Sequence, residues 1–301
     1  MALTISGNFA GVKAAGYIYP ALLTGNTLGQ GLVTIHENVD YRLNVRGITS
    51  QGEILRNAEC NFTDYGDVTI ADTVLEPKEL QVNMQLCKKE FRSEWESLEM
   101  RGNILNQELP SSFLDFFVDR QLAKVAQGVE TAIWQGTAGA NGSFAGLEAA
   151  LAADATVVDV AAVAGGLNAG NIIAQIGLVR DAISNSVYGK EDFSILVPIS
   201  VQKFYIAAQA ALGYQNLYHD GVTGLNFEGI PLKVANGLSD DKMVACRTSD
   251  LHFGTNLLTD MGPELRVLDM AELDGSDNVR FILKFTAGTI NTNGADIVYY
   301  S

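Results

Sequence analysis

The stretch LPSSFLDFFVDRQLAKVAQGVETAI, residues 109–133, decides the fold, because it predicts one long helix within a strand-rich chain. Its large apolar side chains recur mostly at steps of three or four residues, which places them on one face of an α-helix. These side chains are Phe113, Phe117, Leu122, Val125, Val129 and Ile133. We therefore expect a long amphipathic helix at this point of the chain.

A glycine-rich loop, GTAGANG, follows this helix at residues 136–142. It is the nearest approach in the sequence to a phosphate-binding loop. However, it follows a helix instead of a strand, and it lacks the Lys-Ser/Thr ending that a phosphate cradle requires. We therefore predict no nucleotide site here. The sequence also contains no Gly-x-Ser-x-Gly elbow, Walker loop or dinucleotide fingerprint.

Two strand-forming regions precede the helix. Residues 36–75 alternate short β-rich runs with turn signals near residues 47–52 and 65–66, which predicts a long, polar β-hairpin. Two-stranded ribbons are marginal in water, so this hairpin must lie on something. The run LQVNMQL, residues 80–86, alternates apolar and polar side chains and predicts a half-buried strand.

Helices and strands alternate after the glycine loop, which predicts an α/β unit in the middle of the chain and an α+β fold overall. Helices are expected from Asn171 to about Tyr188 and from Ser200 to Ala211, and strands at residues 193–197, 229–235 and 243–246. Near the end, two alternating strands, residues 264–270 and 278–285, predict a second hairpin.

Composition restricts the classes of partner. The net charge of −15 argues against an interface that neutralises many phosphates, because such binding needs clustered Lys and Arg. Hydrophobic residues make up 47% of the chain and charged residues 18%, which favours an obligate oligomer. Cys60, Cys87 and Cys246 are odd in number and widely spaced, so they predict no disulfide framework and suit a reducing cytoplasm.

No combination of residues predicts a catalytic, cofactor-binding or metal site. The three histidines lack metal-ligand spacing, so we interpret them as surface or packing residues: His36, His219 and His252. Glu94, Glu96 and Glu99 alternate with arginines, as is typical of a solvated face. The most apolar long stretch, residues 157–179, contains Asp159 and four glycines and predicts no membrane span. The first residues lack the pattern of a signal peptide.

The order of these elements resembles the Hong Kong 97-type capsid fold of tailed double-stranded-DNA phages. Local segments are similar too. IWQGTAG (133–139) and FAGLE (144–148) resemble the family's turn from spine helix into axial domain, although Phe144-Ala145 replaces the usual proline position. LVPIS (196–200), FEGIPLKV (227–234) and LHFGT (251–255) are similar to a strand-to-helix transition, a Leu-x-Gly-x-Pro-Val strand and a segment before the final hairpin.

This resemblance implies a division of the chain into four parts. They are an N-terminal arm (1–35), an extended β-hairpin loop (36–74), a peripheral domain with the long spine helix (75–142 and 259–288), and an α/β axial domain (143–258 and 289–301).

The resemblance also implies a function, that of a major capsid protein and not of an enzyme. Copies of the chain would self-assemble into pentamers and hexamers of an icosahedral phage head that encloses double-stranded DNA without sequence-specific binding. Scaffold, portal and cement or decoration proteins would be further partners, with no membrane partner. The chain would assemble in the cytoplasm of a bacterial host and reside in the virion.

The general wording is similar to capsid proteins of phages that infect Bacteroidetes. Two other interpretations stay open. An encapsulin-like protein compartment has the same fold with an enzyme cargo, and an oligomeric α/β enzyme with an unrecognised site is the less favoured alternative.

Overall fold

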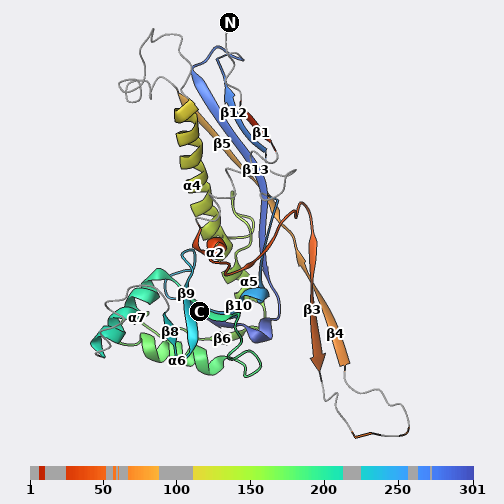
Figure 1. The fold of residues 1–301 in the computed structure, drawn as a ribbon, viewed down its shortest axis with the longest axis vertical. Helices are drawn as coiled ribbons and strands as arrows, with labels where there is room; N and C mark the ends of the chain where they lie inside the picture. Colours follow the sequence, from red (N-terminus) through yellow and green to blue (C-terminus); the bar gives the residue numbers. More distant parts are fainter. Residues whose placement is uncertain are drawn as a thin grey trace.

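The computed structural model describes residues 7–10, 25–51, 57–58, 60, 67–87, 111–212, 225–256, 264–271 and 273–301. Within these residues the molecule is elongated, with a long helix and a sheet at one end and an α/β unit at the other (Figure 1). A two-stranded ribbon projects beside them. None of the described helices is long and apolar enough to cross a membrane.

The long helix is α4, Ser111–Gln135, which confirms the expected helix. Its buried aliphatic side chains recur at steps of three or four residues, and they are Val118, Leu122, Ala126, Val129 and Ile133. This face packs against partly buried side chains of the neighbouring sheet, including Leu80 and Val82. The expected apolar stripe is therefore confirmed at Leu122, Val125, Val129 and Ile133, which hold α4 on the sheet, while the side chains of Phe113 and Phe117 lie outside the described part of the structure.

The first sheet is built around β13, Asn278–Asn291. It pairs antiparallel with β12 (Glu264–Asp269), with β5 (Lys78–Cys87) and with β11 (Leu251–Thr255). Two short strands extend this sheet, β1 (Gly7–Ala10) beside β12 and β2 (Thr34–His36) parallel to β11. The strand expected at 80–86 and the hairpin expected near the end are both confirmed. Strand β13 continues beyond the expected residue 285 because its second half pairs with β11.

The second sheet has the strand order β6-β14-β10-β7-β9-β8. Its strands are β6 (Val158–Val160), β14 (Val298–Tyr300), β10 (Met243–Arg247), β7 (Phe193–Val197), β9 (Ile230–Val234) and β8 (Asn226–Phe227). Helices α6 (Ile172–Ala182) and α7 (Ile199–Ala211) belong to this half, whereas Leu147 and Leu151 of α5 (Leu147–Ala153) are buried in the core that α4 and β13 share. All five residues of β7 are buried, as expected for a central strand.

Helix α6 ends at Ala182, before the expected end near Tyr188. The next residue, Ile183, has an extended backbone with φ −69° and ψ 132°. The Ser186 backbone N–H then donates a hydrogen bond of 3.4 Å to the Ser184 hydroxyl, which also lies 2.8 Å from the Ser186 hydroxyl. Serine side chains offer the backbone such local alternatives to a helix, so the chain turns here instead of continuing α6.

A charged cluster joins the two sheets where β10 leads into β11. Between them lies a short 3-10 helix, η1 (Thr248–Asp250), and a second one, η2 (Gly294–Asp296), precedes β14. The Arg247 guanidinium donates two hydrogen bonds of 2.9 Å to Asp250 and one of 3.2 Å to Asp296. Because the Asp250 side chain is buried, this bidentate pair fixes the junction between the sheets.

Two glycines offer a matched test of how the loop after β9 packs against α4. A Cβ atom on Gly237 would lie 2.2 Å from the Glu130 carbonyl oxygen, whereas one on Gly128, within α4, would meet nothing within 4 Å. We expect Gly237→Ala to lower the free energy of unfolding by about 2 kcal/mol through overpacking. Gly128→Ala should leave it unchanged or raise it by up to about 1 kcal/mol, because alanine favours the helix. Urea unfolding measures both, and equal effects would contradict the packing.

Candidate assembly interface

The projecting ribbon consists of β3 (Leu43–Gln51) and β4 (Asp67–Leu75). They pair antiparallel in nine register positions, from Leu43 opposite Leu75 to Gln51 opposite Asp67. This pairing confirms the hairpin expected between His36 and Leu75. Among the described residues no third strand joins the ribbon, and it extends away from the body of the molecule (Figure 1).

One face of the ribbon carries exposed apolar side chains. Ile70 is 61% exposed and Val74 is 41% exposed. Alternate residues of a strand point to the same face, so both lie with Asp72, which forms an ion pair with Arg46 across the ribbon. Aliphatic side chains on a two-stranded ribbon lower their free energy when another surface covers them.

Buried contacts fix the root of the ribbon, whereas no third strand joins the rest of its length within the described residues. Leu75 is buried, and its side chain occupies the space beside Gly254 of β11 that a Cβ atom would need. The Val39 carbonyl accepts a hydrogen bond of 2.9 Å from the Thr286 hydroxyl, and an Arg42–Glu76 ion pair closes the base. The direction in which the ribbon leaves the body is therefore set by buried contacts.

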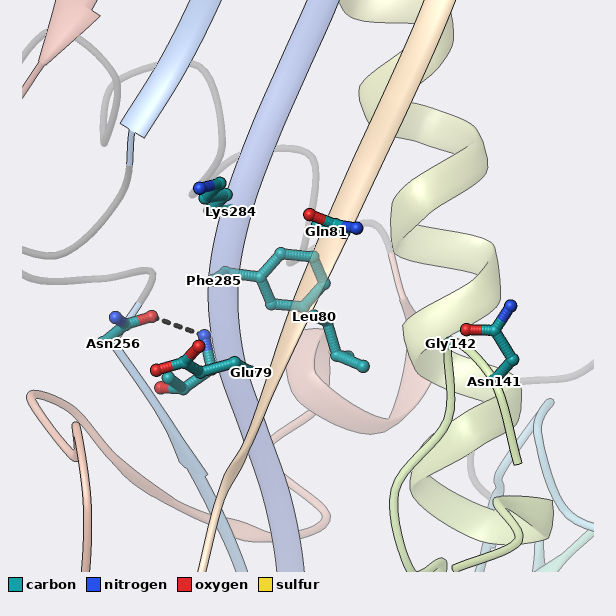
Figure 2. A pocket seen from close by; sticks show the side chains of 9 residues that line it. Glu79, Leu80, Gln81, Asn141, Gly142, Asn256, Lys284 and Phe285 are labelled. Carbon is teal, nitrogen blue, oxygen red and sulfur yellow. Dashed lines mark hydrogen bonds between the residues drawn. The ribbon is translucent and has the colours of Figure 1, made fainter. Parts of the chain in front are cut away.

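A groove lies between β5, β13 and the loop after α4. Its main cavity has a volume of about 490 Å³ and is lined by Glu79, Leu80, Gln81, Asn141, Gly142, Asn256, Lys284, Phe285 and Thr286 (Figure 2). A smaller cavity of about 160 Å³ shares Leu80 and Phe285 and reaches Val125 and Val129 of α4. An apolar floor within a polar rim is typical of a surface that receives another chain.

The glycine loop at 136–142 forms one wall of this groove and binds mainly to its own neighbours. It follows α4, as the sequence indicates, and the Gly146 N–H closes it by donating to the Gly136 carbonyl at 2.8 Å. The Thr137 N–H donates to the Ser143 hydroxyl at 3.1 Å. Gly136 is required by a close backbone approach, since a Cβ atom there would lie 2.3 Å from the Ala132 carbonyl oxygen, whereas Gly139 and Gly142 have positive φ values of 87° and 72°.

Two of the three histidines lie together. His36 Nε2 and His252 Nδ1 are 3.0 Å apart, and His252 Nε2 is 3.0 Å from the Thr292 hydroxyl. This pair was not predicted from the sequence, because 216 positions separate the two residues and only the pairing of β2 with β11 joins them. His219 lies outside the described residues.

Burial sets the protonation of this histidine pair. It lowers the pKa of His36, and burial together with the charge on His36 lowers the pKa of His252 to about 4. Both imidazoles are therefore neutral near pH 7, and both nitrogens of His252 have partners. Within the part of the chain that the structure describes, no group of three or more His, Cys, Asp or Glu side chains could hold a metal ion.

Of the other titratable residues noted in the sequence, the structure describes the three cysteines. Cys60 is exposed, Cys87 is half-buried and Cys246 is buried, and all three are free thiols. Burial raises the pKa of the Cys246 thiol well above its usual range, which keeps it protonated and unreactive. Glu94, Glu96 and Glu99 lie outside the described residues.

Comparison with known proteins finds no match by sequence, since no family model and no curated protein matches the chain. Solved structures match by fold. A chain of the procapsid of satellite phage P4, in a structure that includes the size determination protein, aligns with a TM-score of 0.57 at 11% identity, covering 94% of this chain and 97% of that chain. A chain of the capsid of an empty GTA particle aligns with a TM-score of 0.58 at 14% identity, covering 91% of this chain and 89% of that chain.

A virus-like particle from Pyrococcus furiosus is also similar, with a TM-score of 0.50 at 10% identity, covering 97% of this chain and 99% of that chain. The chain therefore has an α+β fold that chains of viral and virus-like shells share over nearly their whole length. This likeness confirms the expected α+β class and the resemblance to phage capsid proteins at the level of the fold.

The histidine pair predicts a pH dependence of stability. His252 has a lower pKa in the folded chain than its ordinary value of 6.5, so the unfolded chain binds more protons between about pH 6.5 and about pH 4. The free energy of unfolding should fall as the pH falls through this window, by about 3 kcal/mol at most. Urea unfolding of the wild type and of His252→Gln measures the slope.

The variant should show a smaller loss over the same pH range, because glutamine does not titrate. An unchanged slope in His252→Gln would show that the pair does not titrate as described.

Proposed function

We propose that this chain is the major capsid protein of a tailed double-stranded-DNA phage, with the Hong Kong 97-type fold. Its copies would form the pentamers and hexamers of an icosahedral head that encloses DNA. The observation that carries the proposal is the fold, which covers 94% and 91% of this chain in the alignments with chains of the P4 procapsid and the GTA capsid.

The ribbon supplies a physical reason for assembly. Ile70 and Val74 are exposed on an element that has no third strand within the described residues. Covering these side chains with a neighbouring copy contributes about 0.5–2 kcal/mol each, because both are already partly buried. Repeated heterologous contacts that close into rings add such contributions together, so assembly becomes cooperative.

The two sheets support the proposed division into parts. The peripheral domain (75–142 and 259–288) contains β5, α4, β12 and most of β13, and the axial domain (143–258 and 289–301) contains the second sheet with α5, α6 and α7. The proposed arm (1–35) contributes β1 to the edge of the first sheet, and the proposed loop (36–74) contains the ribbon. Strand β11, at the end of the axial segment, hydrogen-bonds into the first sheet.

The proposal assigns no catalytic role and no sequence-specific contact with DNA. A net charge of −15 agrees with a wall that confines DNA without binding its phosphates tightly. The chain itself is the main partner, scaffold, portal and cement or decoration proteins are further proposed partners, and no membrane partner is proposed. The chain would be assembled in the cytoplasm of a bacterial host and would reside in the virion.

An encapsulin-like compartment is the alternative that a specific observation favours. The fold likeness to the virus-like particle from Pyrococcus furiosus covers 97% of this chain. The contents of purified particles distinguish the two functions, because a phage head encloses nucleic acid and a compartment encloses protein cargo. An oligomeric α/β enzyme is less favoured and would form no shell.

The double variant Ile70→Glu/Val74→Glu tests the role of the ribbon. We expect the wild-type chain to sediment as rings, tubes or shells at moderate concentration. The variant should remain as dissociated subunits, because two carboxylates would be costly to bury in a contact between copies. Analytical ultracentrifugation measures assembly, and circular dichroism should show an unchanged subunit fold.

Leu273→Glu provides the matched control. Leu273 is 70% exposed in the turn between β12 and β13, so the variant adds a carboxylate to an exposed leucine outside the ribbon. Its particle yield should equal that of the wild type. Normal assembly of the ribbon variant would refute the proposed role of Ile70 and Val74, and a monomeric wild type would refute the shell function.

A further inference from the structure

A buried carboxylate on the long helix accepts hydrogen bonds from uncharged donors. Glu130 of α4 is 6% exposed, and within the described residues no Lys, Arg or His lies in ion-pair contact with it. Its partners are donors on other elements. The Thr27 N–H lies 3.1 and 3.2 Å from the two carboxylate oxygens, and the Thr27 hydroxyl donates to one of them at 2.5 Å. The backbone N–H of Gly237 donates a further hydrogen bond.

These contacts hold a short helix, α2 (Asn26–Gly29), against α4. The indole N–H of the fully buried Trp134 donates to the Thr27 hydroxyl at 2.8 Å, so this hydroxyl lies between the ring and the carboxylate. The Asn26 side-chain amide donates to the Val234 carbonyl at 2.8 Å. Helix α2 is therefore attached to the body in two ways, by Leu28, which is buried in the core that α4 shares, and by polar groups, of which those of Thr27 meet at Glu130.

We propose that Thr27, Glu130 and Trp134 form a latch that holds α2 on the long helix and that tightens as the solution becomes more acidic. This inference concerns helix α2, which lies within the proposed arm (1–35), and it does not depend on the shell function. It rests on the position of the buried Glu130 carboxylate at the contact between α2 and α4.

The sign follows from the surroundings of the carboxyl group. Burial is the largest influence and raises the pKa of Glu130, while hydrogen bonds from Thr27 and Gly237 lower it by less. The groups that face it are uncharged: Thr27 from α2, Trp134 from its own helix, and the Gly237 backbone from the loop after β9. When α2 leaves, water reaches the carboxyl group and its pKa returns toward the ordinary value.

The docked state therefore binds a proton more tightly than the released state. By linkage, docking of α2 is strongest below the ordinary pKa of the carboxyl group, and this added stability is lost as the pH rises through the raised pKa. Strand β1 forms a separate attachment by pairing with β12, and Glu130 is not part of it. The pH response should thus be confined to the residues around α2.

Hydrogen exchange in the full-length chain tests the latch. Protection of the amides in residues 25–33, corrected for intrinsic exchange, is compared at pH 5 and pH 8, with β7 as an internal reference. We expect the wild type to be protected several-fold more at pH 5. Glu130→Gln should give equal protection at the two pH values, because the amide stays neutral and keeps an oxygen for the Thr27 N–H.

A wild type without this difference, or a Glu130→Gln variant that keeps it, would overturn the proposal. Glu148→Gln is the matched control, since Glu148 is a buried carboxylate of α5 that pairs with Lys242 and Ser239, and its loss should leave the response of residues 25–33 intact. This outcome is distinct from a failure of the proposed shell function. If the latch is absent, the protection of β7 and the formation of particles should both be unchanged.

A second pair of variants gives an independent readout. In the Trp95→Phe variant, Trp134 is the single tryptophan. Its fluorescence emission should change with pH when Thr27 is unchanged. Thr27→Ser keeps the hydroxyl group and should retain this titration, whereas Thr27→Val should abolish it. Identical titrations in Thr27→Ser and Thr27→Val would contradict the proposed role of the hydroxyl group.

Discussion

Backbone pairing along β13 is the constraint on which the rest of the structure depends. This 14-residue strand pairs with β5 on one side in ten register positions, and on the other side with β12 and then β11. Strand β5 follows the ribbon directly in sequence, and β11 carries β2, which precedes the ribbon. A single strand therefore fixes where the ribbon begins and how the sheet meets the long helix, so damage to β13 would disturb every element of this half.

The ribbon is not part of the sheet that β13 organises. Past its root at Leu75, each strand has only the other as partner within the described residues, and Ile70 and Val74 remain exposed. The root is buried beside Gly254, and the Val39 carbonyl accepts a hydrogen bond from Thr286. These contacts fix the direction in which the ribbon leaves the body, but they do not cover its apolar face. A fixed direction combined with an uncovered apolar face is what repeated contact between identical copies requires.

Local periodicity allowed much of this fold to be predicted, because the signal lies within each element. The long helix follows from steps of three and four residues, and the hairpin near the end follows from steps of two. The first hairpin follows from β-rich runs between turn signals, and the strand Phe193–Val197 follows as a buried strand. The expected helix beyond Ala182 was wrong because local serine hydrogen bonds compete with helix formation. The His36–His252 and Thr27–Glu130 contacts join residues 216 and 103 positions apart, and no local pattern contains them. The groove likewise depends on how β5, β13 and the glycine loop meet in three dimensions.

The central claim is that a second copy of the chain covers the apolar face of the ribbon. Cryo-electron microscopy of the purified full-length protein tests this most directly. We expect closed shells in which the Ile70 and Val74 face of each ribbon contacts a neighbouring subunit, while α4 and β13 keep the arrangement of Figure 1. A compact monomer at high concentration, with residues 43–75 packed on its own body, would contradict this claim.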